Sequence, residues 1–164
     1  MIVAVIAEYN PFHNGHLYHI NKARQLNGAE YIIAIMSGNY VQRGEPAIFD
    51  KYLRTKAALI NGADLVIELP LYYASSSAEY FAKCSVKTLE KTNLIDKLFF
   101  GSESGNIGHL AETATFIMNE GEEYKLQLKK ALSRGESFPK SRNIAVNTII
   151  GNNTKILNTP NNIL

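Results

Sequence analysis

Two histidines near the N-terminus are the residues of this chain best placed to do chemistry. His13 and His16 lie three residues apart, with Gly15 between them, directly after the apolar run Ile2–Ala7. Residues at i and i+3 share one side of a helical turn, so both imidazoles can donate hydrogen bonds to phosphate oxygens. Such donors stabilise the charge that develops when a triphosphate is cleaved. The alternative is a pair of surface histidines at a helix start, without any chemistry.

The histidines are predicted to lie where a first strand gives way to a first helix. Ile2–Ala7 is short, unbroken and rich in β-branched residues, which is typical of a strand buried on both faces of a parallel sheet. Pro11 ends that strand, Asn14 is predicted to be the helix N-cap, and Gly15 is expected to let a ligand approach the backbone closely. Ligands of open α/β sheets bind outside the carboxyl ends of the strands, and helix N-termini attract phosphate. We therefore expect a phosphate-binding site here.

Strand and helix patterns alternate through the first two-thirds of the chain. Further buried strands are predicted at residues 30–36, 64–69 and 97–100. Helices are predicted from an N-cap at Asp50 to Gly62, from Ser76 or Ser77 through Leu89, and over residues 107–117. This alternation predicts an α/β fold, a Rossmann-like open parallel sheet with helices on both faces.

The last part of the chain follows a different pattern. Amphipathic helix is predicted at residues 122–132, and a further helix through Val146 and Ile149. We therefore expect a nucleotide-binding catalytic domain over residues 1–120 and a helical extension over residues 121–164. The chain stops on the apolar pair Ile163-Leu164 without a polar tail, which indicates a truncation inside a longer protein.

Composition bounds the classes of function. The chain has 164 residues, 46% hydrophobic and 20% charged, with a formal charge of +2, which fits a globular protein and is too mild to require nucleic acid as a partner. A single cysteine, Cys84, rules out an internal disulfide, makes a structural zinc site unexpected and suits a reducing compartment. No signal peptide or membrane-length apolar segment is present, so a cytoplasmic location without membrane contact is expected. Gly-rich phosphate signatures are also absent, so phosphate binding falls to the histidine segment.

A polar loop follows the second predicted strand at the same edge of the sheet. Its candidates for contacts with an acyl or phosphate group, or with RNA, are Ser37, Asn39, Gln42 and Arg43. Arg43 is the expected partner of an anion. An ordinary polar loop explains the same composition equally well.

Two further features have one functional and one ordinary interpretation each. Lys51, Arg54 and Lys56, together with Arg43, form a basic track for RNA phosphates or a set of solubilising charges. Gly101 follows the fourth strand, where a glycine lets an adenine or ribose lie against the backbone or simply allows a tight turn.

Several strings of this sequence resemble one family. His13-Asn14-Gly15-His16 after a first strand is similar to the His-x-Gly-His signature of nucleotidyltransferases and class I aminoacyl-tRNA synthetases. Residues 8–16, 37–47, 62–70, 77–82, 100–103 and 160–164 together resemble the tRNA(Met) cytidine acetate ligase family. The resemblance covers nearly the whole chain.

The resemblance implies an ATP-dependent ligase. Acetate would attack the α-phosphate of ATP to give acetyl-adenylate and pyrophosphate, and the acetyl group would pass to N4 of the wobble cytidine of elongator tRNA(Met). Mg²⁺ is the expected companion of the triphosphate. His13 and His16 would be catalytic, steadying the triphosphate and the leaving pyrophosphate. The implied ATP-binding residues are Ala7, Glu8, Tyr9, Asn10, Pro11, Phe12, His13, Asn14, Gly15, His16, Leu17, Tyr18, His19, Ile20, Gly101 and Asn162.

Members of this family continue well beyond residues 160–164, so the resemblance implies a catalytic-domain fragment. Two alternatives stay open. A small-molecule adenylyltransferase of the same superfamily would act on phosphorylated acceptors, which predicts more Lys and Arg at the sheet edge than Arg43 supplies. A non-catalytic nucleotide-binding module would keep the pocket without turnover.

Overall fold

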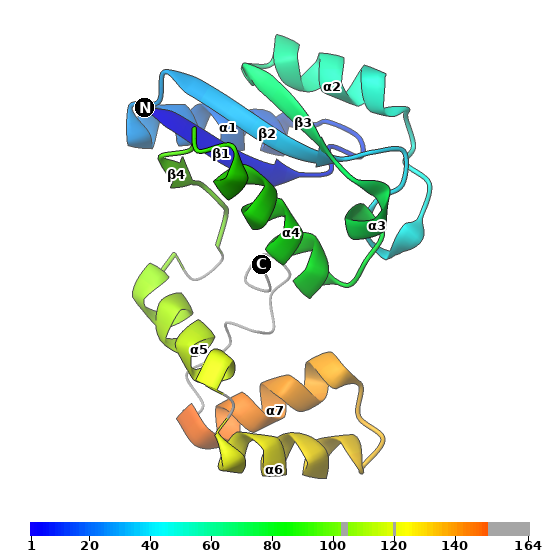
Figure 1. The fold of residues 1–164 in the computed structure, drawn as a ribbon, viewed down its shortest axis with the longest axis vertical. Coiled ribbons are helices and arrows are strands. Elements are labelled where there is room, and N and C mark those ends of the chain that lie inside the picture. The colour runs from blue at the N-terminus through cyan, green and yellow to red at the C-terminus, as the bar shows by residue number, and fades with distance from the viewer. Residues whose placement is uncertain (103–104, 120, 151–164) are drawn as a thin grey trace. The chain divides into compact units, whose positions relative to one another are not determined.

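A four-stranded parallel sheet occupies the first part of the chain. The computed structural model describes residues 1–102, 105–119 and 121–150 (Figure 1). Its strands are β1 (Ile2–Ala7), β2 (Tyr31–Ser37), β3 (Leu65–Leu69) and β4 (Lys97–Leu98). They follow the order β3-β2-β1-β4, and every pairing between neighbours is parallel. The predicted open parallel sheet is confirmed, with strand ends within two residues of the predicted ones.

Helices cover both faces of this sheet. They are α1 (Asn14–Asn27), α2 (Lys51–Ile60), α3 (Leu71–Ala74) and α4 (Ala78–Lys91). On one face Val3 and Val5 pack with Ile20 of α1 and Ala58 of α2. On the other face Ala4, Ile33 and Ile35 pack with Ala74 of α3 and with Phe81 and Leu89 of α4. Successive strand residues point to opposite faces, so the central strands β1 and β2, which are covered on both faces, are apolar at nearly every position.

The topology brings two loops together. Because β1 and β2 are adjacent and parallel, with Ile6 opposite Ile35, their carboxyl ends lie at the same edge of the sheet. The loop after β1 leads into α1, and the loop after β2 contains the short 3₁₀ helix η1 (Gln42–Gly44) before α2 begins. The histidine segment and the polar loop are therefore neighbours, as ligand-binding loops are in open α/β sheets.

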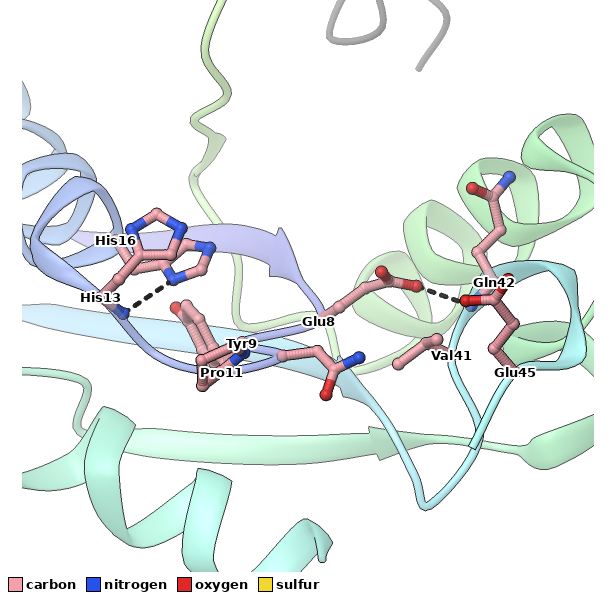
Figure 2. A pocket seen from close by; sticks show the side chains of 9 residues that line it. Glu8, Tyr9, Pro11, His13, His16, Val41, Gln42 and Glu45 are labelled. Atoms are coloured by element: carbon pink, nitrogen blue, oxygen red, sulfur yellow. Dashed lines mark hydrogen bonds between the residues drawn. The ribbon is translucent and has the colours of Figure 1, made fainter. Parts of the chain in front are cut away.

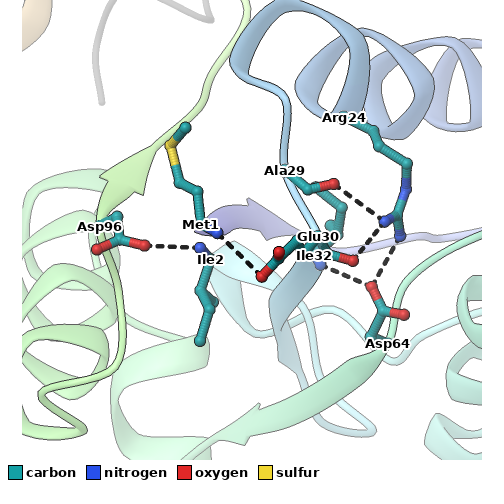
Figure 3. Close-up of polar contacts among 8 residues, drawn as sticks. All are labelled: Met1, Ile2, Arg24, Ala29, Glu30, Ile32, Asp64 and Asp96. Carbon is teal, nitrogen blue, oxygen red and sulfur yellow. Dashed lines mark hydrogen bonds and ion pairs between the residues drawn. The ribbon is translucent and has the colours of Figure 1, made fainter.

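Polar contacts stabilise the opposite edge of the sheet, the amino edge, at which the parallel strands begin (Figure 3). Asp64 Oδ2 accepts hydrogen bonds from the N–H of Ile32 at 2.7 Å and from Arg24 Nη2 at 2.8 Å. Arg24 also donates to the carbonyl oxygens of Ala29, Glu30 and Gly62. These bonds fix the starts of β2 and β3 to helix α1.

The rest of the described chain is helical, as predicted. It holds α5 (Ile107–Asn119), α6 (Glu122–Leu132) and α7 (Phe138–Ile150), which form their own core around Tyr124, Ala145 and Val146. Contacts divide the chain into two compact units after Phe100, whereas the sequence analysis drew the boundary at residue 120. The difference is α5, whose Phe116 ring contacts Tyr124 of α6 at a centroid distance of 5.9 Å. Among the described residues, every helix is too short or too polar to cross a lipid bilayer.

Candidate functional site

The two histidines cap helix α1 together. His13 is the N-cap, and its Nδ1 accepts the N–H of Gly15 at 3.0 Å. His16 Nδ1 in turn accepts the N–H of His13 at 3.2 Å (Figure 2). The prediction of Asn14 as N-cap was wrong by one residue, because an imidazole nitrogen takes the place of the usual side-chain oxygen. With Nδ1 accepting, a neutral imidazole carries its proton on Nε2, so each ring keeps one N–H donor.

The imidazole rings of His13 and His16 lie face to face. Their centroids are 3.7 Å apart with an interplanar angle of 27°, and the Tyr9 ring meets His16 edge-on at 5.0 Å. Burial, with smaller contributions from the neighbouring His13 and His19, lowers the pKa of His16 from 6.5 to about 4. His16 is therefore neutral at physiological pH. It can donate a hydrogen bond through Nε2, but it does not offer a positive charge.

The structure gives a reason for a glycine at position 15 that the sequence did not reveal. A Cβ atom at this position would lie 2.9 Å from Cε1 and 3.0 Å from Nδ1 of His13. The atoms that approach the Gly15 backbone are thus those of the His13 ring, where the sequence analysis expected a ligand. Any side chain here would push His13 out of its capping position.

A pocket of about 400 Å³ lies at the carboxyl edge, between the loops that follow β1 and β2 (Figure 2). The residues that line it are Glu8, Tyr9, Asn10, Pro11, His13, His16, Val41, Gln42 and Glu45. Glu8 Oε1 accepts the N–H of Gln42 at 2.6 Å, which joins the two loops across the pocket. Val41 and Glu45 were not singled out in the sequence. The only indication in the sequence that they line a pocket was their position in the loop after a buried strand.

Only part of the predicted ATP-binding segment, residues 7–20, lines the pocket. Six of its residues line the pocket. Phe12 supports them from the side, with ring centroids 5.0 Å from Tyr9 and 5.5 Å from His16. Ile20 has no exposed surface and belongs to the core. His19 packs against Phe99 at 5.1 Å, and burial lowers its pKa.

The polar-loop candidates are also placed differently from one another. Ser37 is fully buried, and Asn39 Oδ1 accepts the N–H of Lys51 at 3.0 Å. Gln42 contributes its backbone N–H to the contact with Glu8. The Arg43 side chain lies outside the described part of the chain.

Two predicted ATP-site residues remain, Gly101 and Asn162. Gly101 is the first residue of the second compact unit. Asn162 falls outside the described residues. Across the ranges that the structure describes, no group of three or more His, Cys, Asp or Glu side chains could hold a metal ion.

Arg54 does not belong to a basic track for RNA phosphates, because it is buried. Its side chain is 1% exposed and donates to the carbonyl oxygens of Phe49 at 3.0 Å, Glu8 at 2.5 Å and Gly38, so it is not available to RNA. Lys51 is bound to Glu68 at 2.6 Å. The signal for Arg54 was its register: it lies four residues before the fully buried Ala58, on the inner face of α2.

Comparison with known proteins gives the class to which this fold and site belong. The family model described as HIGH Nucleotidyl Transferase matches residues 1–164, and the chain belongs to that family. A tRNA(Met) cytidine acetate ligase of Thermoanaerobacter sp. (strain X514) is 50% identical over 165 residues, which cover 99% of this chain and 41% of the relative. A protein of the same name from Halothermothrix orenii is 53% identical over 145 residues, 88% of this chain and 34% of its own length. These names confirm the resemblance found in the sequence.

Solved structures of a related protein have the same fold over the length of this chain. The crystal structure of Thermotoga maritima TmcAL bound with alpha-thio ATP superposes with a TM-score of 0.90 at 41% identity, covering 99% of this chain and 41% of that protein. The apo form of the same protein gives a TM-score of 0.91, with 40% of its chain covered. The present chain thus spans about two-fifths of the length of its relatives.

Proposed function

We propose that this chain is the nucleotide-binding catalytic part of an ATP-dependent tRNA(Met) cytidine acetate ligase. It would form acetyl-adenylate from acetate and ATP and pass the acetyl group to N4 of the wobble cytidine of elongator tRNA(Met). The observation that carries the proposal is the stacked pair His13 and His16, each with Nδ1 used as an acceptor and Nε2 left as a donor beside the pocket. Support comes from the relatives' name and from the ATP analogue bound by the Thermotoga protein.

In this proposal the histidines act on the triphosphate through hydrogen bonds. An acetate oxygen attacks the α-phosphorus, the bond to the bridging oxygen breaks, and pyrophosphate leaves with the negative charge. Two preorganised Nε2–H donors at a helix N-terminus stabilise that charge, and neither residue becomes covalently bound. In the second step N4 of the cytidine attacks the acetyl carbonyl, AMP leaves, and N4 loses a proton.

Mg²⁺ belongs to the proposal as a companion of ATP. The described lining offers two carboxylates, Glu8 and Glu45, and the described chain has no cage of three or more ligands. Mg²⁺ that enters with the triphosphate would therefore keep mainly phosphate and water ligands, as it does in many ATP sites. When bound, it would neutralise part of the phosphate charge. A cytoplasmic location also belongs to the proposal, since tRNA is the substrate and the free Cys84 suits a reducing compartment.

The test is acetate-dependent exchange of pyrophosphate into ATP, measured on the full-length protein. We expect exchange that requires acetate, and we expect His16→Ala to lower it by about 100-fold or more, in line with the loss of an electrostatic donor. His109→Ala, which removes an exposed histidine of α5, is the matched control. Exchange that needs no acetate would favour a small-molecule adenylyltransferase. ATP binding without any exchange would favour a non-catalytic nucleotide-binding module.

A further inference from the structure

Arg54 joins three backbone segments at the carboxyl edge of the sheet. Its Nη1 donates to Glu8 in the loop after β1, its Nη2 to Gly38 in the loop after β2, and its Nε to Phe49 just before α2. The side chain is 1% exposed, and all three acceptors are backbone carbonyls. Of the three acceptor residues Glu8 lines the pocket, while Gly38, Phe49 and Arg54 itself are not among the described lining residues.

These contacts orient two peptide groups. The Glu8–Tyr9 and Gly38–Asn39 peptides are trans, so in each the N–H points opposite to the carbonyl. Since both carbonyls point at Arg54, the N–H groups of Tyr9 and Asn39 point away from it. Neither N–H has a hydrogen-bond partner within the part of the chain that the structure describes. The two peptides are neighbours, because one guanidinium binds both.

The pocket has few other groups that attract an anion. Among the side chains that the structure describes, its lining has the carboxylates of Glu8 and Glu45 and no lysine or arginine. His16 is neutral at physiological pH, so it contributes a dipole only. Backbone N–H groups held in a fixed direction are a known way to bind anionic oxygens without a charged side chain.

We infer that Arg54 is a positioning residue that holds the N–H group of Tyr9, a residue of the pocket lining, ready for the anionic oxygens of the nucleotide's triphosphate. The inference rests on the proposed function, because it needs a nucleotide in this pocket. Arg54 does not touch the nucleotide. It sets the direction of the Tyr9 N–H, because its charge draws the Glu8 carbonyl of the same peptide group toward it.

Arg24 provides a matched control. It also donates to backbone carbonyls, but at the amino edge of the sheet: those of Ala29 and Glu30 (Figure 3) and that of Gly62. Arg24→Lys and Arg54→Lys therefore make the same chemical change, in which a forked donor becomes a single ammonium group. They do so at opposite ends of the strands.

The experiment measures ATP and adenosine binding by calorimetry in the full-length wild type, Arg54→Lys and Arg24→Lys. We expect Arg54→Lys to weaken ATP binding by about 10-fold or more while adenosine binding stays within about two-fold, because only ATP has the anionic oxygens. Arg24→Lys should lower the melting temperature and leave the ratio of the two affinities unchanged. An equal loss for both ligands in Arg54→Lys, or no loss, overturns the inference.

A second measurement covers the case in which Arg54→Lys does not fold. The amide signal of Tyr9 in wild-type protein labelled with ¹⁵N should shift on addition of ATP and not on addition of adenosine. ATP binding that leaves this signal in place overturns the inference while the proposed function stands. A wild type that does not bind ATP removes the proposed function itself.

Discussion

His16 Nδ1 accepts the backbone N–H of His13 at 3.2 Å, while the imidazole rings of the two residues stack at 3.7 Å. The same pair of side chains thus caps the N-terminus of α1 and lines the pocket. The hydrogen bonds that satisfy the free N–H groups of the helix start also select the Nε2–H form of both rings. Capping through Nδ1 and the proposed chemistry through Nε2–H therefore depend on the same two rings.

Gly15→Ala should damage the site with little effect on the rest of the fold. The new Cβ would lie 2.9 Å from the His13 ring, so the ring must leave Gly15 N–H and lose its orientation. We expect acetate-dependent exchange to fall by roughly 10- to 100-fold, as for the loss of one preorganised donor. Gly121→Ala is the control, because its Cβ meets nothing within 4 Å and its φ is −54°. Unchanged exchange in Gly15→Ala would show that the His13 position is unimportant.

His16 should make stability depend on pH. Its pKa is about 4 in the folded protein and near 6.5 in the unfolded chain, so between these values the unfolded state binds more protons. The contribution is fully present above pH 6.5 and is lost as the pH falls toward 4. We expect on the order of 1 kcal/mol, reduced by solvent screening.

The measurement is the free energy of unfolding by denaturant at pH 7 and pH 4.5, for wild type and His16→Asn. Carboxylates titrate in both proteins, so the difference between the two pH profiles isolates His16. Profiles of the same steepness would mean that His16 titrates normally in the folded protein.

Asp64→Ala should lower stability without touching the pocket. Asp64 accepts from Ile32 N–H and Arg24 at the amino edge of the sheet, so the substitution removes the acceptor of Ile32 N–H and one of the four acceptors of Arg24. We expect a loss of about 1–3 kcal/mol in the free energy of unfolding, with ATP affinity unchanged. Glu30→Gln breaks a more exposed pair with the N-terminal amine and should cost less than about 1 kcal/mol. Equal effects of the two substitutions would contradict this ranking.

Glu8→Gln should strengthen ATP binding when divalent cations are chelated. Glu8 lines the pocket, and its negative charge opposes a triphosphate, while a glutamine oxygen can still accept the N–H of Gln42. Removing one like charge near a protein surface predicts a gain of about 3- to 10-fold, measured by calorimetry in EDTA. Glu8→Ala removes the acceptor as well, so it should lack this gain. Weaker ATP binding by Glu8→Gln in EDTA would assign Glu8 a direct contact with the nucleotide.

Local sequence patterns predicted the sheet, helices α1, α2 and α4 and the histidine pair, but not the four-residue helix α3. A strand buried on both faces is apolar at nearly every position, so β1 and β2 could be recognised, to within one residue, without knowledge of their neighbours. His13 and His16 are three residues apart, and the geometry of one helical turn brings them together. These features depend on contacts between residues that are close in the sequence, so the spacing of residue types is enough to predict them.

Contacts between distant residues were decided by the tertiary structure alone. Glu8 meets the N–H of Gln42, and Arg54 meets the carbonyl of Glu8, across 34 and 46 positions of the chain. Nothing local in the sequence shows whether an arginine on a short helix faces water or the core, so the pattern predicts for Arg54 either an RNA contact or a solubilising charge, and both place it at the surface. Only the packing of α2 against the sheet buries it, and a buried guanidinium must find acceptors, which the two loop carbonyls supply. The pocket exists because of that long-range packing, which no local periodicity encodes.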